Sequence, residues 1–184
     1  MKRHAKVVTV FGSSRPRVGD AHYADAHALG AALAAKGFVV CSGGYAGVME
    51  AVSRGAKEAG GRTLGVTAKS FSSRANKWID EEIRVTNWKE RLFELVKRGH
   101  GYVECRGGTG TLVELAVVWE MLNKGVMKRR PLVAMGDFWQ PIVNRVCEVD
   151  LGHQFVRGGV ADRCVQFVAS PADAADYLAT YLEK

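Results

Sequence analysis

The sequence lacks the cysteine spacings and the long apolar runs that mark several large protein classes. Its four cysteines lie far apart and form no C-x-x-C pair, so zinc sites and dithiol redox motifs are not predicted. No apolar stretch approaches the roughly 20 residues that a membrane-spanning helix needs. The basic N-terminus is followed by an apolar run only as long as a strand, so we expect no signal peptide. These absences predict a cytoplasmic protein without a membrane partner.

Familiar cofactor motifs are also missing. The first predicted strand is not followed by the G-x-G-x-x-G spacing of dinucleotide folds, and no acidic residue ends the second one. No glycine turn ends in the Gly-Lys-Ser/Thr of a P-loop, and there is no G-x-S-x-G elbow. The five histidines show no H-E-x-x-H spacing. We therefore expect neither a nicotinamide dehydrogenase nor a nucleoside triphosphatase, and no metal or other cofactor.

The charge balance favours an anionic ligand. Lys and Arg number 26 against 19 Asp and Glu, which gives a net charge of +7. Nucleic acid is not the predicted partner, because the basic residues are scattered. The densest basic run, residues 128–130, has no interleaved aromatic side chains on which bases would stack. A small anion such as a nucleotide fits this pattern better.

Strand-like and helix-like segments alternate along the 184 residues, which are enough for one domain with a buried core. Amphipathic or alanine-rich segments separate seven apolar runs that are typical of strands, at residues 6–11, 38–41, 63–66, 83–85, 101–105, 132–135 and 165–168. Gly37 is expected to end the first helix and Ser170 to cap the last one. The alternation predicts an α/β fold: a single-domain, Rossmann-like, three-layer structure with a parallel sheet flanked by helices.

The most informative segment is the glycine-rich turn at residues 106–114, RGGTGTLVE. It lies between a predicted strand and a run of apolar residues with helical spacing. Glycines let the backbone approach a ligand closely, and the N–H groups of a first helical turn point at an anion. The sequence therefore predicts a phosphate-bearing ligand at this turn, bound by Gly107, Gly108, Thr109, Gly110 and Thr111.

Two further turns are expected to share this site. The second predicted strand is followed by Gly43, Gly44 and Gly47, and the first by Gly12 and Ser13. Carboxyl ends of parallel strands meet at one edge of a sheet, where open α/β folds bind ligands. We therefore expect one crevice at this edge. Met49 is expected to be a core residue or a wall of the site. The polar segment at residues 68–80 is expected to form a mobile loop over it.

The two glycine turns, G-G-x-x-G-V-M at residues 43–49 and G-G-x-G-T-x-x-E at residues 107–114, resemble the paired signatures of the LOG (Lonely Guy) family. Members are Rossmann-like nucleotide-binding proteins, often mislabelled lysine decarboxylases, and the best studied are cytokinin riboside 5′-monophosphate phosphoribohydrolases. The resemblance implies hydrolysis of the N-glycosidic bond of a nucleoside 5′-monophosphate such as AMP, which releases the free base and ribose 5-phosphate. It also implies a homodimer or larger homo-oligomer, for which Val118, Trp119 and Trp139 would supply apolar surface.

The same resemblance implies that Arg91 and Glu114 are the catalytic pair. Arg91 lies at the distance before the second signature at which the family carries an arginine. Other positions depart from the family pattern, namely Ser42, Leu92, Arg106, Thr109 and Val113. The G-G-T-G-T form of the second signature looks closer to the branch that contains the molybdenum cofactor carrier proteins, which bind a phosphorylated pterin. The alternative function is therefore a non-catalytic nucleotide-binding or cofactor carrier protein that uses the same turns.

Both catalytic candidates also have a purely structural interpretation. Thr111 and Glu114 have the spacing of a capping box, in which the threonine caps a helix and the glutamate bonds back to it. Arg91 has the spacing of an exposed helical arginine paired with Glu94. A structure distinguishes these interpretations, because each one predicts different contacts for the same side chain.

Overall fold

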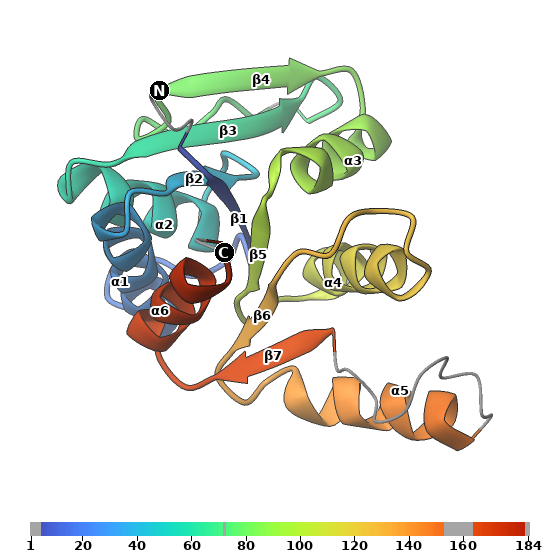
Figure 1. Cartoon of the computed structure of the whole chain (residues 1–184). Coiled ribbons are helices and arrows are strands. Elements are labelled where there is room, and N and C mark those ends of the chain that lie inside the picture. Colours follow the sequence, from blue (N-terminus) through green and yellow to red (C-terminus); the bar gives the residue numbers. More distant parts are fainter. Residues whose placement is uncertain (1–4, 72, 153–163, 183–184) are drawn as a thin grey trace.

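A computed structural model describes residues 5–71, 73–152 and 164–182. Its strands are β1 (Val7–Phe11), β2 (Val39–Ser42), β3 (Arg62–Ala68), β4 (Glu81–Val85), β5 (Gly101–Glu104), β6 (Leu132–Met135) and β7 (Val165–Val168). They form one seven-stranded sheet in the order β4-β3-β2-β1-β5-β6-β7 (Figure 1). Every neighbouring pair is parallel, as the alternation of strands and helices predicts.

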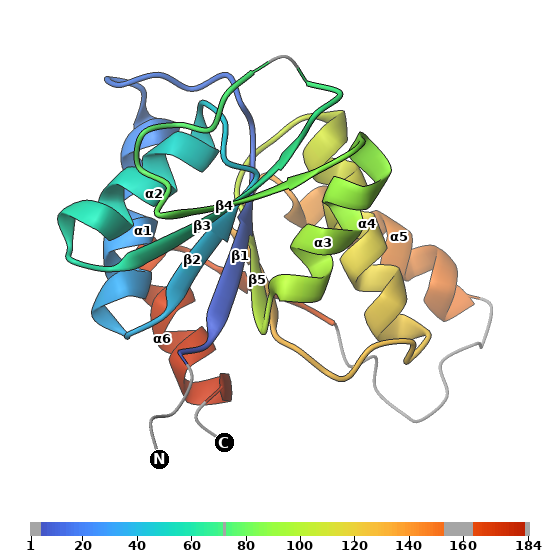
Figure 2. The same cartoon turned by 90° about the horizontal axis from the view of Figure 1, so that it is seen from above.

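Helices cover both faces of the sheet. One face carries α1 (Ala21–Ala35), α2 (Val48–Glu58) and α6 (Pro171–Leu182). The other carries α3 (Trp88–Arg98), α4 (Thr109–Asn123) and α5 (Gln140–Gly152), and the view from above separates the two layers (Figure 2). The predicted three-layer α/β architecture is confirmed.

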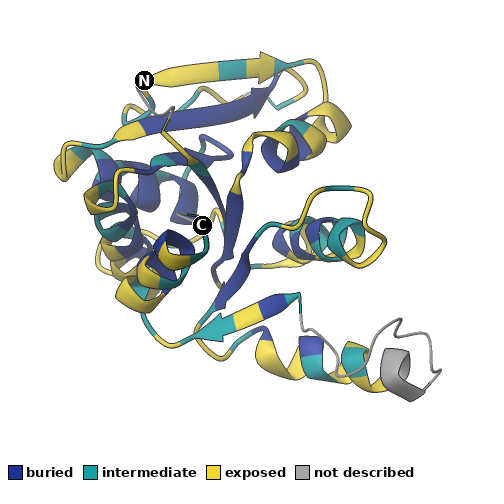
Figure 3. Ribbon diagram, in the orientation of Figure 1, coloured by how far each residue is buried: buried dark blue, intermediate teal, exposed yellow. Residues whose placement is uncertain are grey.

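The core lies between the sheet and each helical layer, where Figure 3 shows the buried stretches of the central strands. Side chains of a strand alternate between the two faces. In β1, Val8 and Val10 belong to the cluster under α1, α2 and α6. Phe11 belongs to the cluster under α3, α4 and α5, and Thr9 donates its hydroxyl to the carbonyl of Leu95 on α3 at 3.1 Å. The central strands β1, β2 and β5 are therefore buried on both faces, which explains their nearly continuous apolar runs.

The order of the strands places a topological switch point between β1 and β5. From β1 the chain builds outward through β2 and β3 to β4, and it then returns to add β5 on the other side of β1. The connection after β1 leads to α1 on one face, whereas the connection after β5 leads to α4 on the other. Open α/β sheets bind their ligands where such connections diverge, at the carboxyl ends of the strands.

Two predicted helix signals are confirmed. Gly37 follows α1 with a φ of +78°, a left-handed conformation that glycine adopts at low cost. At the start of α6, the hydroxyl of Ser170 accepts a hydrogen bond from the backbone N–H of Asp173 at 3.2 Å. The Asp173 carboxylate in turn accepts from the backbone N–H of Ser170 at 3.1 Å. These reciprocal bonds form a capping box.

One prediction about the surface is wrong. Val118 and Trp139 are buried, so they supply no apolar surface to a partner. Both belong to the core cluster between the sheet and α4 and α5, and the indole N–H of Trp139 donates to the carbonyl of Cys105 at 2.9 Å.

Among the described residues, no helix combines the length and the apolar character needed to cross a membrane.

Candidate functional site

The turns after β1, β2 and β5 are hydrogen-bonded to one another. The backbone N–H of Ser13 donates to the carbonyl of Arg106 at 3.2 Å, and the N–H of Val48 donates to the carbonyl of Ser13 at 2.9 Å. Glycine is needed for this approach. A Cβ on Gly12 would lie 2.6 Å from a methyl carbon of Val48, and one on Gly47 would lie 2.3 Å from the Ser13 carbonyl oxygen. The structure thus brings the three predicted turns together at one edge of the sheet.

The turn after β5 has the geometry of an anion site. Gly108 is the N-cap of α4, and the first helical hydrogen bond runs from the N–H of Leu112 to the carbonyl of Gly108 at 2.9 Å. The N–H groups of residues 109–111 therefore have no acceptor within the helix. A Cβ added to Gly108 or Gly110 would meet no atom within 4 Å, so the space beside this turn is open. Free donors at the positive end of a helix dipole next to open space suit a phosphate.

The capping-box interpretation of Thr111 and Glu114 is wrong. Helix α4 begins at Thr109, three residues earlier than that interpretation requires, and its N-cap makes no side-chain hydrogen bond. Thr111 lies inside the first turn and is buried against Gly107, whose added Cβ would lie 2.1 Å from the threonine hydroxyl. Thr111 is therefore part of the support of the turn. The Glu114 side chain is free of capping and faces α3.

Arg91 is held inside the protein, so its interpretation as an exposed partner of Glu94 is also wrong. Its side chain comes from the first turns of α3 and is 9% exposed. Its Nε donates to the carbonyl of Val66 on β3 at 2.8 Å, and its Nη1 lies 4.0 Å from Oε1 of Glu114 on α4. Glu94 pairs instead with Arg98, four residues further on. The catalytic pair implied by the family resemblance is thus adjacent in space, on two different helices.

The second glycine turn forms the wall beside Arg91. The sulfur of Met49 lies 3.6 Å from Nη2 of Arg91, and the Tyr45 ring centroid lies 5.2 Å from the guanidinium carbon. A Cβ on Gly43 would lie 1.6 Å from the same Nη2, so only glycine leaves room for the guanidinium. Met49 is buried, which confirms the prediction of a core residue, and its place as a wall of a ligand site stays a prediction.

The segment between β3 and β4 is bound to this wall. The Tyr45 hydroxyl accepts from the N–H of Ala68 at 3.0 Å, and the Tyr45 ring lies edge-on to Phe71, with the centroids 5.8 Å apart. Asn76 donates its backbone N–H to the Gly44 carbonyl at 2.8 Å and its side-chain amide to the Tyr45 carbonyl at 2.9 Å. The segment therefore lies against the site, as predicted, and its mobility stays a prediction.

Burial sets the charge state of the pair. Desolvation raises the pKa of Glu114 to about 7, and the attraction of Arg91 opposes that rise. Desolvation also lowers the pKa of Arg91, with Glu114 acting in the opposite direction. Near neutral pH, Glu114 can therefore exist with or without its proton, which is the property of a carboxyl group suited to acid–base work.

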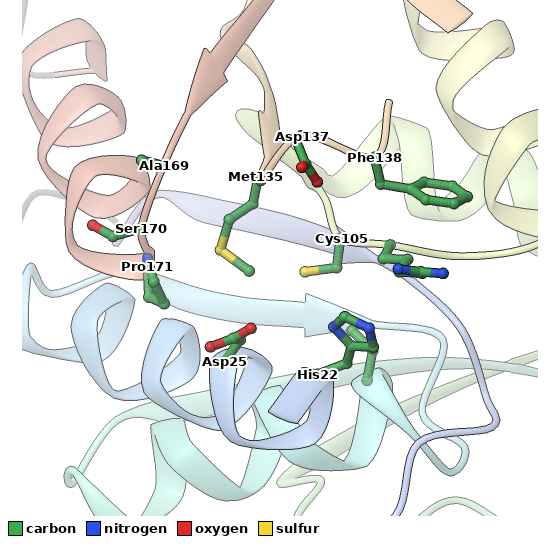
Figure 4. A pocket seen from close by; sticks show the side chains of 12 residues that line it. His22, Asp25, Cys105, Met135, Asp137, Phe138, Ala169, Ser170 and Pro171 are labelled. Atoms are coloured by element: carbon green, nitrogen blue, oxygen red, sulfur yellow. The ribbon is translucent and has the colours of Figure 1, made fainter. Parts of the chain in front are cut away.

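A pocket of about 330 Å³ opens at the same edge of the sheet, over the carboxyl ends of β5, β6 and β7. Figure 4 shows His22 and Asp25 from α1 facing Met135 and Asp137 across it, with Cys105 between them. Arg106, which directly precedes the glycine turn, lines the pocket, and its guanidinium carbon lies 4.8 Å from the ring centroid of Phe138. The pocket therefore adjoins the glycine turn at Arg106. No sequence motif indicated it, because its lining comes from five separate segments.

The sequence also gave no indication of Glu104. This residue ends β5, is fully buried, and has both carboxyl oxygens without a hydrogen-bond partner among the described residues.

Of the positions that depart from the family pattern, Ser42 and Leu92 are buried. Thr109 is exposed at the mouth of the turn, and Val113 is partly buried.

The model of the SLOG cluster4 family matches residues 5–145. A cytokinin riboside 5′-monophosphate phosphoribohydrolase of Mycobacterium marinum is 39% identical over 97 residues, which cover 51% of this chain and 52% of that protein. A cytokinin riboside 5′-monophosphate phosphoribohydrolase LOG of Oryza sativa is 29% identical over 147 residues, 77% of this chain and 60% of that protein. The matches therefore span only about half of the first relative's length and 60% of the second's.

Solved structures agree with the fold. The structure of the molybdenum cofactor carrier protein from Chlamydomonas reinhardtii superposes with a TM-score of 0.75 at 22% identity. The match covers 98% of this chain and 100% of that one. At this level of identity, the likeness supports the shared Rossmann-like architecture of the whole chain.

Proposed function

The chain belongs to the SLOG cluster4 family, and on that premise we propose that it is a nucleoside 5′-monophosphate phosphoribohydrolase. It hydrolyses the N-glycosidic bond of a ligand such as AMP and releases the free base and ribose 5-phosphate. The observation that carries the proposal is the contact between Arg91 and Glu114 at 4.0 Å, close to the open N-terminus of α4. A cation and a carboxyl group that can be ionised or neutral near pH 7 thus lie beside the proposed phosphate-binding turn.

Binding begins at the glycine turn. The N–H groups of residues 109–111 and the dipole of α4 receive the 5′-phosphate. Gly107, Gly108 and Gly110 keep the backbone accessible, while Gly12, Ser13, Gly43, Gly44 and Gly47 form the neighbouring wall of the crevice. The Thr109 hydroxyl adds a donor at the exposed start of the helix. The ligand is thereby anchored by its phosphate, with its sugar directed toward Arg91 and Glu114.

The chemistry follows from the charge that develops on the sugar. When the C1′–N bond breaks, its electron pair leaves with the base and positive charge builds on the ribose ring. The ionised Glu114 carboxylate stabilises that charge and accepts a proton from the water whose oxygen bonds to C1′. The departing base takes up one proton and Glu114 gives up the one that it accepted, so the protein ends the reaction in its starting protonation state. Arg91 binds the phosphate or the sugar and fixes the orientation of Glu114.

The comparisons support this assignment. The two relatives described above are named as cytokinin riboside 5′-monophosphate phosphoribohydrolases, and they match 51% and 77% of this chain. The assembly and location that we propose are those implied by the family resemblance, a cytoplasmic homodimer or larger homo-oligomer that acts without a cofactor or metal. Three exposed apolar side chains on α3 and α4, Trp88, Phe93 and Leu112, are available for self-association.

A second candidate function is a non-catalytic carrier of a nucleotide or of molybdenum cofactor. The likeness to the Chlamydomonas carrier protein over nearly all of both chains favours it. The pocket next to Arg106 also favours this function, because it offers additional volume beside the glycine turn. In this alternative the glycine turn still binds a phosphate, and Glu114 takes part in no bond cleavage.

One experiment distinguishes the two functions. Purified protein is incubated with AMP, GMP, CMP and UMP, and the products are separated by chromatography. Release of a free base together with ribose 5-phosphate supports the hydrolase. Ligand binding without release of base from any monophosphate favours the carrier.

A further inference from the structure

Glu104 lies directly behind the candidate site. It is the last residue of β5, paired with Phe11 on β1 and with Ala134 on β6. Because side chains alternate along a strand, Glu104 shares its face with Tyr102, which packs in the cluster under α3 and α4. Its carboxyl group therefore lies on the side of the sheet from which Arg91 and Glu114 approach.

The environment of this carboxyl group is unusual. Glu104 is 0% exposed, and neither of its oxygens has a hydrogen-bond partner among the described residues. An ionised carboxylate without a partner is very costly in a protein interior, and the cost falls when the group binds a proton. Glu104 is therefore a neutral carboxylic acid, with an O–H group that has no acceptor in the structure.

The charged groups on this side of the sheet confirm that state. The titratable side chains buried on this side of the sheet include Arg91 on α3, Glu114 on α4, Tyr102 on β5 and Cys41 on β2. Glu94 and Arg98 on α3 are more exposed and pair with each other. Burial and then the charge of Glu114 raise the pKa of Glu104 well above its usual range. The charged group that acts on Glu104 is thus a second carboxylate, that of Glu114.

Among the described residues, Glu104 lacks a hydrogen-bond acceptor, and Glu114 in turn lacks a hydrogen-bond donor. Its carboxylate makes no hydrogen bond with a described residue, and its one ion-pair contact, with Arg91, is 4.0 Å long. A buried acid that lacks an acceptor and a carboxylate that lacks a hydrogen-bond donor are thus on the same side of the sheet, and the charge of the second acts on the first. Two carboxyl groups in such a position relieve both deficiencies by sharing one proton.

We propose that Glu104 is a positioning residue for Glu114: it holds a proton and donates that O–H to the Glu114 carboxylate whenever Glu114 is ionised. The hydrogen bond orients Glu114 toward Arg91 and the ligand and stabilises its charged form. This hydrogen bond forms as Glu114 loses its proton. The inference rests on the proposed function, in which Glu114 is the working carboxylate.

If Glu104 served only to stabilise the core, its replacement would change the free energy of unfolding in the opposite direction. Its strand neighbours Phe11 and Ala134 are apolar and buried, so an apolar side chain fits this position better than a carboxyl group without partners. Replacement of a purely structural core residue lowers stability. Replacement of a buried acid that serves Glu114 leaves stability unchanged or raises it.

The test compares the parent protein with Glu104→Gln and Glu104→Met. Glutamine is neutral and keeps an N–H donor for Glu114, whereas methionine has a similar length and no donor. The titration of the Glu114 carboxyl is followed by NMR of its side-chain carbon in each protein. Infrared spectra, recorded for each protein at a pH above the titration of Glu114, report the carbonyl stretch of a carboxylic acid that remains protonated, and denaturant unfolding reports stability. None of these readouts needs enzymatic activity, so they stand even if no base is released.

We expect Glu114 to titrate at a higher pH in Glu104→Met than in the parent, because the charged form has lost a donor. Glu104→Gln should titrate close to the parent. The infrared band should be present in the parent and absent from both variants, and Glu104→Met should unfold at an equal or higher denaturant concentration. Unchanged titration in Glu104→Met, a parent without the band, or a clear loss of stability in Glu104→Met would each overturn the proposal.

Discussion

Gly43 lies so close to Arg91 that a Cβ atom added to it would sit 1.6 Å from Nη2 of the guanidinium. The same Cβ would lie 2.6 Å from the sulfur of Met49. Both contacts involve the ends of flexible side chains, which can move aside at little cost to the fold. The side chain that moves is nevertheless the one that contacts Glu114. Gly43 therefore fixes the position of Arg91 by leaving space for it.

Gly43→Ala should accordingly separate activity from stability. We expect a loss of kcat/KM of about a hundredfold, because a displacement of about 1 Å in a catalytic group has that effect. The unfolding midpoint in denaturant should change little. Steady-state kinetics and denaturant unfolding of the same preparation measure both quantities. A variant with parental activity would show that the position of Arg91 is not critical.

Arg91 and Arg98 offer a matched pair on one helix. Arg91→Ala removes a buried charged hydrogen bond to the Val66 carbonyl, and we expect a loss of about 2 kcal/mol in the free energy of unfolding. It should also raise the pKa of Glu114 further, since Arg91 is the group that holds it down. Arg98→Ala breaks only a helix-surface pair with Glu94 and should cost less than about 0.5 kcal/mol. Equal losses from denaturant unfolding of the two variants would contradict the buried role of Arg91.

The resemblance to a known family identified Arg91 and Glu114, but the residues alone favoured other roles for them. Sequence spacing allowed a capping box at Thr111 and Glu114 because it cannot locate the first residue of a helix. In the structure, α4 begins at Thr109 and this alternative disappears. Spacing also allowed a pair between Arg91 and Glu94, but the side chain of Arg91 is buried by contacts with β3, which is distant in sequence.

The strands, their parallel arrangement and the meeting of the glycine turns followed from the sequence, since each rests on local patterns. Glu104 and the pocket beside Arg106 did not. The pocket is assembled from five segments, and no spacing rule connects them. Glu104 could have been noticed as a carboxyl group at the end of an otherwise apolar strand next to a glycine turn. Its lack of partners is visible only once the neighbouring helices are placed.

The phosphate seat predicts a difference between nucleotides and nucleosides. AMP should raise the melting temperature, with a stabilisation of about 2.7 kcal/mol at a hundredfold excess over Kd, while adenosine should raise it far less. Gly108→Val should keep the fold, because a Cβ there meets no protein atom within 4 Å. Its side chain should occupy the space of the phosphate and abolish the shift. Equal shifts from AMP and adenosine in a melting assay would place the recognition elsewhere.

Stability should depend on pH through Glu114. Burial raises its pKa from 4.5 to about 7, so between these values the folded protein holds a proton that the unfolded chain releases. The free energy of unfolding should therefore be highest below about pH 4.5, as far as this group is concerned, and fall as the pH rises through 7. Glu114→Gln removes this contribution, and its unfolding free energy should fall less over the same range. Parallel pH profiles for the two proteins would show that Glu114 is not buried in the way described.

The most direct test of the account is release of base by the parent and by Glu114→Gln. Glutamine keeps the shape of the side chain but cannot carry the negative charge that the developing sugar cation requires. Chromatography of reactions with AMP should show adenine and ribose 5-phosphate from the parent. The rate with Glu114→Gln should be lower by about a hundredfold or more, while AMP still raises the melting temperature of the variant. Release of base at the parental rate by Glu114→Gln would contradict the account.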